Sequence, residues 1–263
     1  MMTMGWGKKN RLSRIIKADG RTLMLAVDHG YFLGPTTGLE NPRKAVTPLI
    51  PYADCLMPTR GVLRSCIDPK ADIPIVLRVS GGTSILAKNL LHEGITASIK
   101  DALRLNVAGV AFSIMVGSEY ERDTILGLSK VVDEAEEYGI PVVAVTAVGK
   151  EMGKDEKYLS LASRIAAEHG ASMVKTYYCE NFERVVDTCP VPIVIAGGKK
   201  LPELEALEMA QKAVEAGAVG VDMGRNIFQA DDPVAMIRAV RAIVHDKATA
   251  KEAHAMLTHK GKK

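Results

Sequence analysis

The stretch that decides the fold is residues 171–200, ASMVKTYYCENFERVVDTCPVPIVIAGGKK. It contains two short runs rich in aliphatic and β-branched residues, Met173–Thr176 and Ile193–Ala196, with a segment of helix length between them. Both runs are almost continuously apolar, which is typical of parallel strands covered on both faces. A strand, a helix and a second strand of this length form one β/α unit.

The same unit recurs along the chain. Six more runs of this kind follow one another at intervals of about 20 to 35 residues, the length of one strand-and-helix unit. Eight such units in 263 residues predict a TIM (β/α)8 barrel of the α/β class. An open doubly wound sheet is the alternative, but no G-x-G-x-x-G motif follows the first run. The six further runs are Thr22–Val27, Asp54–Met57, Ile75–Val79, Gly109–Ile114, Val142–Thr146 and Gly220–Met223.

Helix signals occupy the segments between the runs. Pro202 begins an apolar-periodic segment that Gly217 ends, and proline in the first turn with glycine after the last is the expected asymmetry of a helix. Comparable periodicity, in which apolar positions recur every three or four residues, marks other segments. The further expected helices are Asp123–Tyr138, Lys157–His169 and Asp232–Val244.

Composition indicates a folded globular chain. Hydrophobic residues make up 47% and charged residues 25%, values that exclude intrinsic disorder and small disulfide scaffolds. We find no linker and no shift in composition, so we expect one domain over residues 1–263, with an N-terminal extension (1–20) and a C-terminal helix with a basic tail (246–263). No apolar window is long enough for a membrane span, and no signal peptide is recognisable.

Charge and cysteine content give no sign of a nucleic-acid or metal partner. The net charge is +3, and the basic segments Lys8–Arg14 and His259–Lys263 lack interleaved aromatic residues, so we expect solvated ends and no nucleic-acid binding. The four cysteines include no C-x-x-C pair and match no zinc spacing. We therefore predict free thiols, a cytoplasmic location and no metal site.

In TIM barrels the active site lies at the carboxyl ends of the strands. Gly197-Gly198 and Gly224-Arg225 follow the seventh and eighth runs, where such barrels often bind phosphate. Glycine lets backbone N–H groups approach an oxyanion, and a guanidinium matches phosphate with two hydrogen bonds. The alternative is a tight turn with a surface ion pair, but two such turns in the two expected places favour a phosphate site.

Lys175 stands near the end of an apolar run, where a lysine points into the barrel mouth or towards the helices. Desolvation and nearby cations favour the neutral amine, which can attack a carbonyl. The alternative is a structural ion pair, with Asp28 as the first candidate. Asp28 follows the first run, where it can hold a substrate hydroxyl, move a proton or pair with Lys175, unless it only caps the loop.

Other polar residues are less informative. Lys199 and Lys200 either add positive charge to the phosphate site or are solvated. His29 has no second metal ligand at a suitable spacing. Three other histidines, His92, His169 and His245, are expected at the surface without a functional role.

At these residues the sequence resembles the class I aldolase family of archaeal and bacterial type, from about Arg21 to His245. The resemblance rests on LAVDHG (25–30), VKTYY (174–178), VIAGGKK (194–200) and GVDMGRNIFQ (220–229). It implies a TIM barrel and a homo-oligomer, commonly a decamer. For the site it implies a Schiff-base lysine (Lys175), a substrate-contacting carboxylate (Asp28) and a phosphate cradle (Gly197, Gly198, Gly224 and Arg225).

One departure from the family bears on the reaction. Aldolase members carry a tyrosine on the fifth strand as general acid and base, whereas this chain has VTAVGK at 145–150. A thiolate that adds to a ketone largely replaces that base. The segments DHGYF (28–32), GPTTGLE (34–40) and CPVP (189–192) also resemble the members that transfer an acyl group to coenzyme A.

The expected activity is therefore thiolytic cleavage of a phosphorylated diketone into dihydroxyacetone phosphate and acetyl-CoA. Coenzyme A acts as a co-substrate, although no motif for it is readable, and no permanently bound cofactor is expected. A sugar-phosphate aldolase of the fructose-bisphosphate type, or a transaldolase-like synthase, is the first alternative. A sugar-phosphate-binding protein without catalysis is the second.

Overall fold

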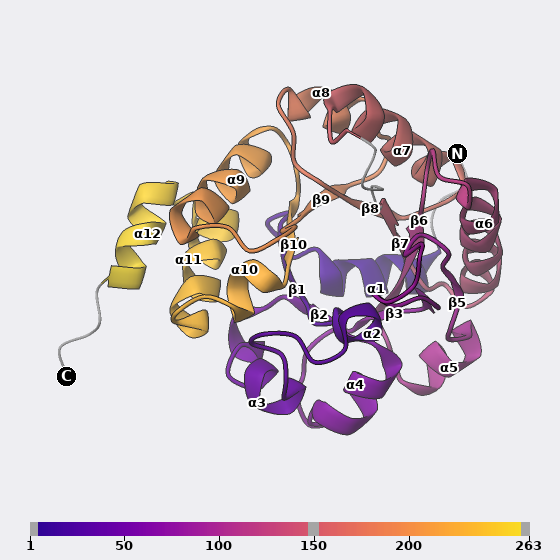
Figure 1. The fold of residues 1–263 in the computed structure, drawn as a ribbon, viewed down its shortest axis with the longest axis horizontal. Helices are drawn as coiled ribbons and strands as arrows, with labels where there is room; N and C mark the ends of the chain where they lie inside the picture. Colours follow the sequence, from indigo (N-terminus) through magenta and orange to yellow (C-terminus); the bar gives the residue numbers. More distant parts are fainter. Residues whose placement is uncertain (1–4, 147–152, 259–263) are drawn as a thin grey trace.

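The computed structural model describes residues 5–146 and 153–258. Eight parallel strands form one sheet that curves into a barrel surrounded by helices (Figure 1). The strands are β1 (Thr22–Ala26), β2 (Cys55–Met57), β3 (Val76–Arg78), β6 (Gly109–Ile114), β7 (Val142–Thr146), β8 (Met173–Thr176), β9 (Ile193–Ala196) and β10 (Gly220–Met223). Their order is β2-β1-β10-β9-β8-β7-β6-β3.

The two end strands of this order also meet. Parallel bridges join Leu56 to Ile75 and Thr59 to Arg78, so β2 lies beside β3 and the sheet returns on itself. The predicted TIM barrel is confirmed, and the open doubly wound alternative is wrong. Five of the eight predicted runs both begin and end at the residues where the strands do, and β1, β2 and β3 are shorter than predicted by one residue at one or both ends.

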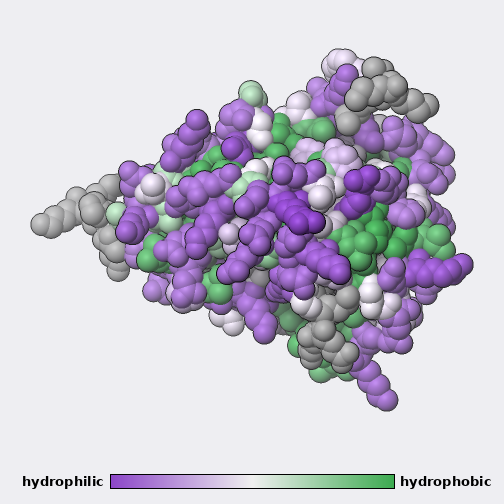
Figure 2. All heavy atoms as spheres, turned by 90° about the horizontal axis from the view of Figure 1, so that it is seen from above, coloured by the Kyte–Doolittle hydropathy of each residue, from purple (hydrophilic) through white to green (hydrophobic). Residues whose placement is uncertain are grey.

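Helices cover the outside of the barrel. The face over α7 and α9 is mostly hydrophilic (Figure 2), because each helix turns its apolar side inward, as Leu159, Ala162 and Ala166 of α7 do. The helices are α1 (Trp6–Ile15), α2 (Gly30–Leu33), α3 (Pro42–Val46), η1 (Ile50–Tyr52), α4 (Arg60–Cys66), α5 (Ile99–Arg104), α6 (Glu121–Glu137), α7 (Glu156–Glu168), α8 (Phe182–Asp187), α9 (Glu203–Glu215), α10 (Arg225–Phe228), α11 (Pro233–Asp246) and α12 (Ala250–Thr258).

The barrel wall separates two hydrophobic clusters. Side chains alternate between the two faces of a strand, so Met173 lies in the inner cluster and Val174 lies in the outer cluster under the helices. Towards the carboxyl ends the inward positions become polar, and Arg78, Ser113 and Lys175 each lie two residues beyond a member of the inner cluster. The buried polar residues at this level are Arg78, Ser113, Lys175 and Asp222.

Helix α1 closes the amino end of the barrel, where Figure 1 shows it behind the ring of strands. Ile15 is fully buried and packs into the inner cluster. Lys8 forms an ion pair with Glu136, and Arg11 Nη1 donates to the carbonyl of Gly139 at 3.2 Å. The prediction that Lys8–Arg14 is a solvated end is therefore wrong.

His245 is also not the plain surface residue that was predicted. Its side chain is 9% exposed, with Nε2 2.7 Å from Asp54 Oδ2 and Nδ1 2.6 Å from Asp19 Oδ2. Asp54 also accepts a hydrogen bond from the backbone N–H of Leu23 at 2.6 Å and pairs with Arg241 at 3.0 Å. The cluster ties α11 to the starts of β1 and β2.

The chain ends and one short hairpin complete the description. Helix α12 falls within the predicted C-terminal segment and extends away from the barrel (Figure 1); the predicted basic tail at 259–263 lies outside the described residues. The antiparallel pair β4 (Ser80–Gly81) and β5 (Gly94–Ile95) was not predicted.

Within residues 5–146 and 153–258, every helix is too short or too polar to cross a bilayer. That residues 1–263 form one domain stays a prediction.

Candidate functional site

A cavity of about 250 Å³ opens at the carboxyl ends of the barrel strands. The structure brings all the predicted site residues to it, although they come from the ends of four different strands, β1, β8, β9 and β10, or from the loops that follow them. Lys199 and Lys200 are exposed and do not line it. The predicted residues in the cavity wall are Asp28, Lys175, Gly197, Gly198, Gly224 and Arg225.

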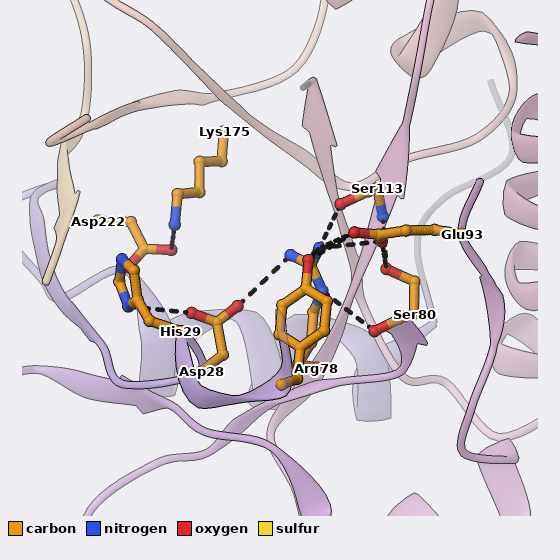
Figure 3. A network of polar contacts seen from close by, with 9 residues as sticks. Asp28, His29, Arg78, Ser80, Glu93, Ser113, Lys175 and Asp222 are labelled. Atoms are coloured by element: carbon orange, nitrogen blue, oxygen red, sulfur yellow. Dashed lines mark hydrogen bonds and ion pairs between the residues drawn. The ribbon is translucent and has the colours of Figure 1, made fainter. Parts of the chain in front are cut away.

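Lys175 faces into the barrel and pairs with Asp222. Its Nζ lies 2.9 Å from Asp222 Oδ2, and the two side chains are 10% and 0% exposed (Figure 3). The expected partner Asp28 is wrong, because β10 presents the inward carboxylate of Asp222 at the level of Lys175. Burial raises the pKa of Asp222 even though the charge of Lys175 opposes that shift. Asp222 can therefore exchange a proton with an amine on Lys175.

Asp28 occupies the middle of the cavity between two other groups. Its Oδ2 lies 3.5 Å from Arg78 Nη1 and its Oδ1 lies 3.6 Å from His29 Nδ1 (Figure 3). The Asp28 side chain is 7% exposed, so water reaches it mainly through the cavity. A carboxylate in this position can accept a hydrogen bond from a substrate hydroxyl.

Arg78 belongs to a dense polar network. Its Nη2 donates to Tyr31 Oη at 2.6 Å and to Glu93 Oε2 at 3.1 Å, and it also donates to the hydroxyl of Ser113. Glu93 accepts a further hydrogen bond from Ser80 Oγ at 2.8 Å. The sequence did offer a signal for Arg78, which interrupts an apolar run. It offered none for Tyr31, in the short helix α2, or for Glu93, in the loop before β5.

His29 lies at the edge of the cavity in an apolar setting. Burial, with smaller contributions from nearby cations, lowers its pKa to about 4, although Asp28 acts in the opposite direction. Its ring packs edge-on against Phe228 with centroids 5.5 Å apart. His29 is therefore neutral near pH 7. Among the described residues, no cluster of three or more His, Cys, Asp or Glu side chains is arranged to hold a metal ion.

The two glycine turns adopt conformations that require glycine. Gly198 has φ of +68°, in the left-handed region. A Cβ at Gly224 would come within 2.4 Å of the carbonyl oxygen of Ala26. Asn226 joins the turns, because its Nδ2 donates to the carbonyl of Gly197 at 2.6 Å. The Nε of Arg225 is buried and has no hydrogen-bond partner among the described residues, which leaves a donor for an anion.

A further cation lies beside this cradle. Lys154 Nζ sits 3.8 Å from the centre of the Tyr177 ring, and Tyr177 lines the cavity. Partial burial and the charges of Lys199 and Arg225 lower the pKa of Lys154. Positive charge therefore converges on the glycine turns, as an anionic ligand requires. Lys154 lies in a loop and was not predicted as a site residue.

The fifth-strand segment is only partly described. Val145 and Thr146 line the cavity, and the hydroxyl of Thr146 donates to the hydroxyl of Thr176 at 2.7 Å. Residues 147–150, on which the comparison with the aldolase tyrosine depends, lie outside the described residues.

Comparison with known proteins agrees with this arrangement. The model of the DeoC/LacD aldolase family matches residues 22–230. The chain belongs to this family. It is 55% identical over 253 residues, 95% of this chain and 87% of the relative, to a 3-hydroxy-5-phosphonooxypentane-2,4-dione thiolase of Photorhabdus laumondii. A protein of the same description from Escherichia coli K12 is 56% identical over 253 residues, with 95% and 87% covered.

Solved structures of the family share the barrel. An archaeal fructose 1,6-bisphosphate aldolase superposes with a TM-score of 0.82 at 26% identity, covering 91% of this chain and 99% of that chain. Another structure of an archaeal fructose-1,6-bisphosphate aldolase, with its catalytic lysine covalently bound to the carbinolamine intermediate of the substrate, gives a TM-score of 0.81 at 26% identity, covering 90% of this chain and 99% of that chain.

Proposed function

We propose that this chain is a thiolase that cleaves 3-hydroxy-5-phosphonooxypentane-2,4-dione with coenzyme A into dihydroxyacetone phosphate and acetyl-CoA. The observation that carries the proposal is Lys175, buried at the barrel mouth beside Asp222 in a chain 55–56% identical to proteins of that description. The reaction proceeds through a Schiff base on Lys175. Coenzyme A is a co-substrate, and the chemistry needs no permanently bound cofactor.

The phosphate group of the substrate binds in the cradle of glycine turns. Backbone N–H groups of Gly197, Gly198 and Gly224 approach the phosphate oxygens, and Arg225 supplies a charged donor. Lys154 adds a second positive charge at the same place. The cradle orients the substrate so that the ketone next to the phosphate-bearing carbon lies near Lys175.

Lys175 then forms the covalent intermediate. Its neutral amine adds to that ketone, and loss of water leaves an iminium. Asp222 accepts a proton from the nitrogen and returns it to the departing hydroxyl, which its distance of 2.9 Å from Nζ allows. Asp28 accepts a hydrogen bond from the hydroxyl on the next carbon.

The thiolate of coenzyme A completes the cleavage. It adds to the distal acetyl carbonyl, a sulfur–carbon bond forms, and the carbonyl electron pair moves to oxygen. When that carbonyl forms again, the carbon–carbon bond breaks and its electrons pass to the iminium nitrogen. Acetyl-CoA leaves, and the remaining enamine takes up a proton and is hydrolysed to dihydroxyacetone phosphate.

An aldolase reaction is the second candidate, because the archaeal structures above are those of fructose 1,6-bisphosphate aldolases. Aldol cleavage requires a base for the hydroxyl proton, and the aldolase tyrosine is missing from VTAVGK at 145–150. The thiolase reaction does not depend on that base, so it fits this chain better.

Product analysis on one preparation tests the proposal. The diketone phosphate and fructose 1,6-bisphosphate are each incubated with and without coenzyme A. We expect the diketone phosphate to be consumed only with coenzyme A, giving acetyl-CoA, and fructose 1,6-bisphosphate to be cleaved poorly. Fast cleavage of fructose 1,6-bisphosphate, with no effect of coenzyme A on the diketone, would support an aldolase instead.

Assembly and location extend the proposal. We expect a homo-oligomer, with a decamer as the first expectation, acting in the cytoplasm on a small phosphorylated ketone. Sedimentation velocity of the purified chain measures the assembly, and a monomer would contradict this part.

A further inference from the structure

The guanidinium group of Arg78 lies in the cavity wall and is held in one orientation by its neighbours. Its side chain is 5% exposed. Nε is directed to the carbonyl of Ser80 at 3.4 Å, and Nη2 is occupied by the neighbours described above. Nη1 makes its contact with Asp28 at 3.5 Å, across the cavity. An arginine has five N–H donors. Arg78 lines the cavity, and its Nη1 donors are those not taken up by the neighbours of Nε and Nη2.

The network around Arg78 holds it rigid and charged. Glu93, 5% exposed, accepts from Nη2 at 3.1 Å, and Tyr31 donates to Glu93 Oε1 at 2.5 Å. Although burial opposes the charge, Tyr31, Glu93 and Asp28 raise the pKa of Arg78. Donors fixed in advance in a site shielded from water stabilise a developing negative charge most effectively.

The position of Arg78 in the barrel relates it to one end of the substrate. Its strand β3 is four strands away from β9 in either direction around the barrel, so it faces the Gly197-Gly198 turn across the cavity. Figure 3 shows Lys175 with Asp222 on one side, Asp28 between, and Arg78 on the other side. The order is therefore phosphate cradle, Lys175, Asp28 and Arg78.

The functional groups of the substrate follow the same order. From the phosphate outward, the chain carries a ketone, a hydroxyl and a second carbonyl on successive carbons. With the phosphate in its cradle, the first ketone on Lys175 and the hydroxyl at Asp28, the second carbonyl reaches Arg78. This step of the argument rests on the proposed function.

We propose that Arg78 binds the oxygen of this second carbonyl and takes up the negative charge that forms there when the thiolate adds. The electron pair of the carbonyl moves onto the oxygen as the sulfur–carbon bond forms, and Nη1 donates to it. The charge leaves the oxygen again when the carbonyl re-forms and the carbon–carbon bond breaks. Arg78 keeps its protons throughout, so no further reactant is needed.

A purely structural role is the competing explanation. Arg78 joins the barrel to the segment between β4 and β5 through Glu93, and this contact alone would account for its burial. A structural role predicts that losing Arg78 disturbs every reaction of Lys175 equally. A role at the second carbonyl predicts a loss only for molecules that have one.

The experiment therefore compares two probes of Lys175 that differ in this carbonyl. Pentane-2,4-dione condenses with the amine, releasing water, to form an enaminone that keeps one carbonyl and absorbs in the near ultraviolet. Dihydroxyacetone phosphate forms an imine that borohydride traps, and it has no second carbonyl. The variants are Arg78→Gln and a double variant, Arg78→Met with Glu93→Gln, which removes the buried carboxylate of Glu93 together with its cation.

We expect both variants to bind pentane-2,4-dione about 10- to 100-fold more weakly, the effect of one charged hydrogen bond, and to trap dihydroxyacetone phosphate within about twofold of the parent. Thiolysis should fall by about 10²- to 10³-fold. Arg241→Met removes an arginine paired with Asp54 outside the cavity and should leave both probes unchanged. Lys175→Ala should abolish the enaminone.

Two results would overturn the inference. Unchanged enaminone formation in both variants would remove Arg78 from the carbonyl, and an equal loss with both probes would assign it a structural role. Neither readout requires coenzyme A. If the parent protein fails to produce acetyl-CoA, the proposed thiolase function fails while the contact of Arg78 with a carbonyl is still decided by the two probes.

Discussion

Lys175 and Asp222 lie on β8 and β10, with β9 between them, and meet inside the barrel. The charged residues Arg78, Lys175 and Asp222 each interrupt an apolar strand, so period-2 alternation could have identified all three. Lys175 was identified, whereas the run Gly220–Met223 predicted a strand with no role for Asp222. Which carboxylate pairs with Lys175 depends on how the strands close, and spacing along the chain does not contain that information.

Substitution Asp222→Asn tests the proton exchange with Lys175. Asparagine keeps the shape but accepts no proton, so formation of the iminium should slow by about 10²- to 10⁴-fold, the usual contribution of general acid–base catalysis. The rate of borohydride trapping with dihydroxyacetone phosphate measures this. Binding of inorganic phosphate should stay within about twofold and serves as the control for folding. An unchanged trapping rate would exclude Asp222 from the reaction.

Substitution Arg225→Ala tests the phosphate cradle. Losing a charged hydrogen-bond partner costs about 1.5–3 kcal/mol, so KM should rise about 10- to 100-fold. The value of kcat should change little, because the phosphate contact is the same in the ground state and the transition state. Steady-state kinetics measures both constants. Unchanged affinity for phosphorylated substrate would move the cradle elsewhere.

At the scale of elements, local signals determined most of what could be predicted. Strand β9 was predicted to the residue because Pro192 and Gly197 flank its apolar run. Helix α1 was not predicted, because only Ile15 of its ten residues is buried and no apolar stripe is visible. Strands β4 and β5 have two residues each, which is too short for any periodicity.

The cluster of His245, Asp19 and Asp54 makes stability depend on pH. Hydrogen bonds to the two carboxylates raise the pKa of His245, and the contact with His245 lowers that of Asp19 and, despite burial, that of Asp54. The stabilisation is complete between about pH 4 and pH 6.5, the unperturbed values of Asp and His. It is lost as pH rises through the raised pKa of His245, and as pH falls through the lowered values of the aspartates.

Substitution His245→Gln should therefore lower Tm most near pH 5–6 and least near pH 9, a window set by the unperturbed values of these side chains. Losing one charged hydrogen bond costs about 1.5–3 kcal/mol of unfolding free energy. Thermal denaturation of both proteins across this range gives the difference. His29, whose pKa is lowered to about 4, is present in both proteins and cancels. A difference in Tm that does not vary with pH would contradict this account.

At the scale of the whole molecule, closure of the barrel creates the site. Bridges between β2 and β3 complete the ring, and the loops after β1, β9 and β10 then share one cavity. The sequence predicted that these loops meet, because the carboxyl ends of barrel strands face the same side. It could not predict that Glu93 and Tyr31 surround Arg78, since that depends on the path of the loop between β4 and β5 and on where the short helix α2 lies.

Covalent trapping on Lys175 tests the central claim most directly. The protein is treated with borohydride in the presence of dihydroxyacetone phosphate and then digested. The masses of its peptides are measured by mass spectrometry. We expect the three-carbon phosphate on Lys175 alone, and none in Lys175→Arg. Modification of Lys150, Lys154 or Lys200 in place of Lys175, or no modification at all, would contradict the account.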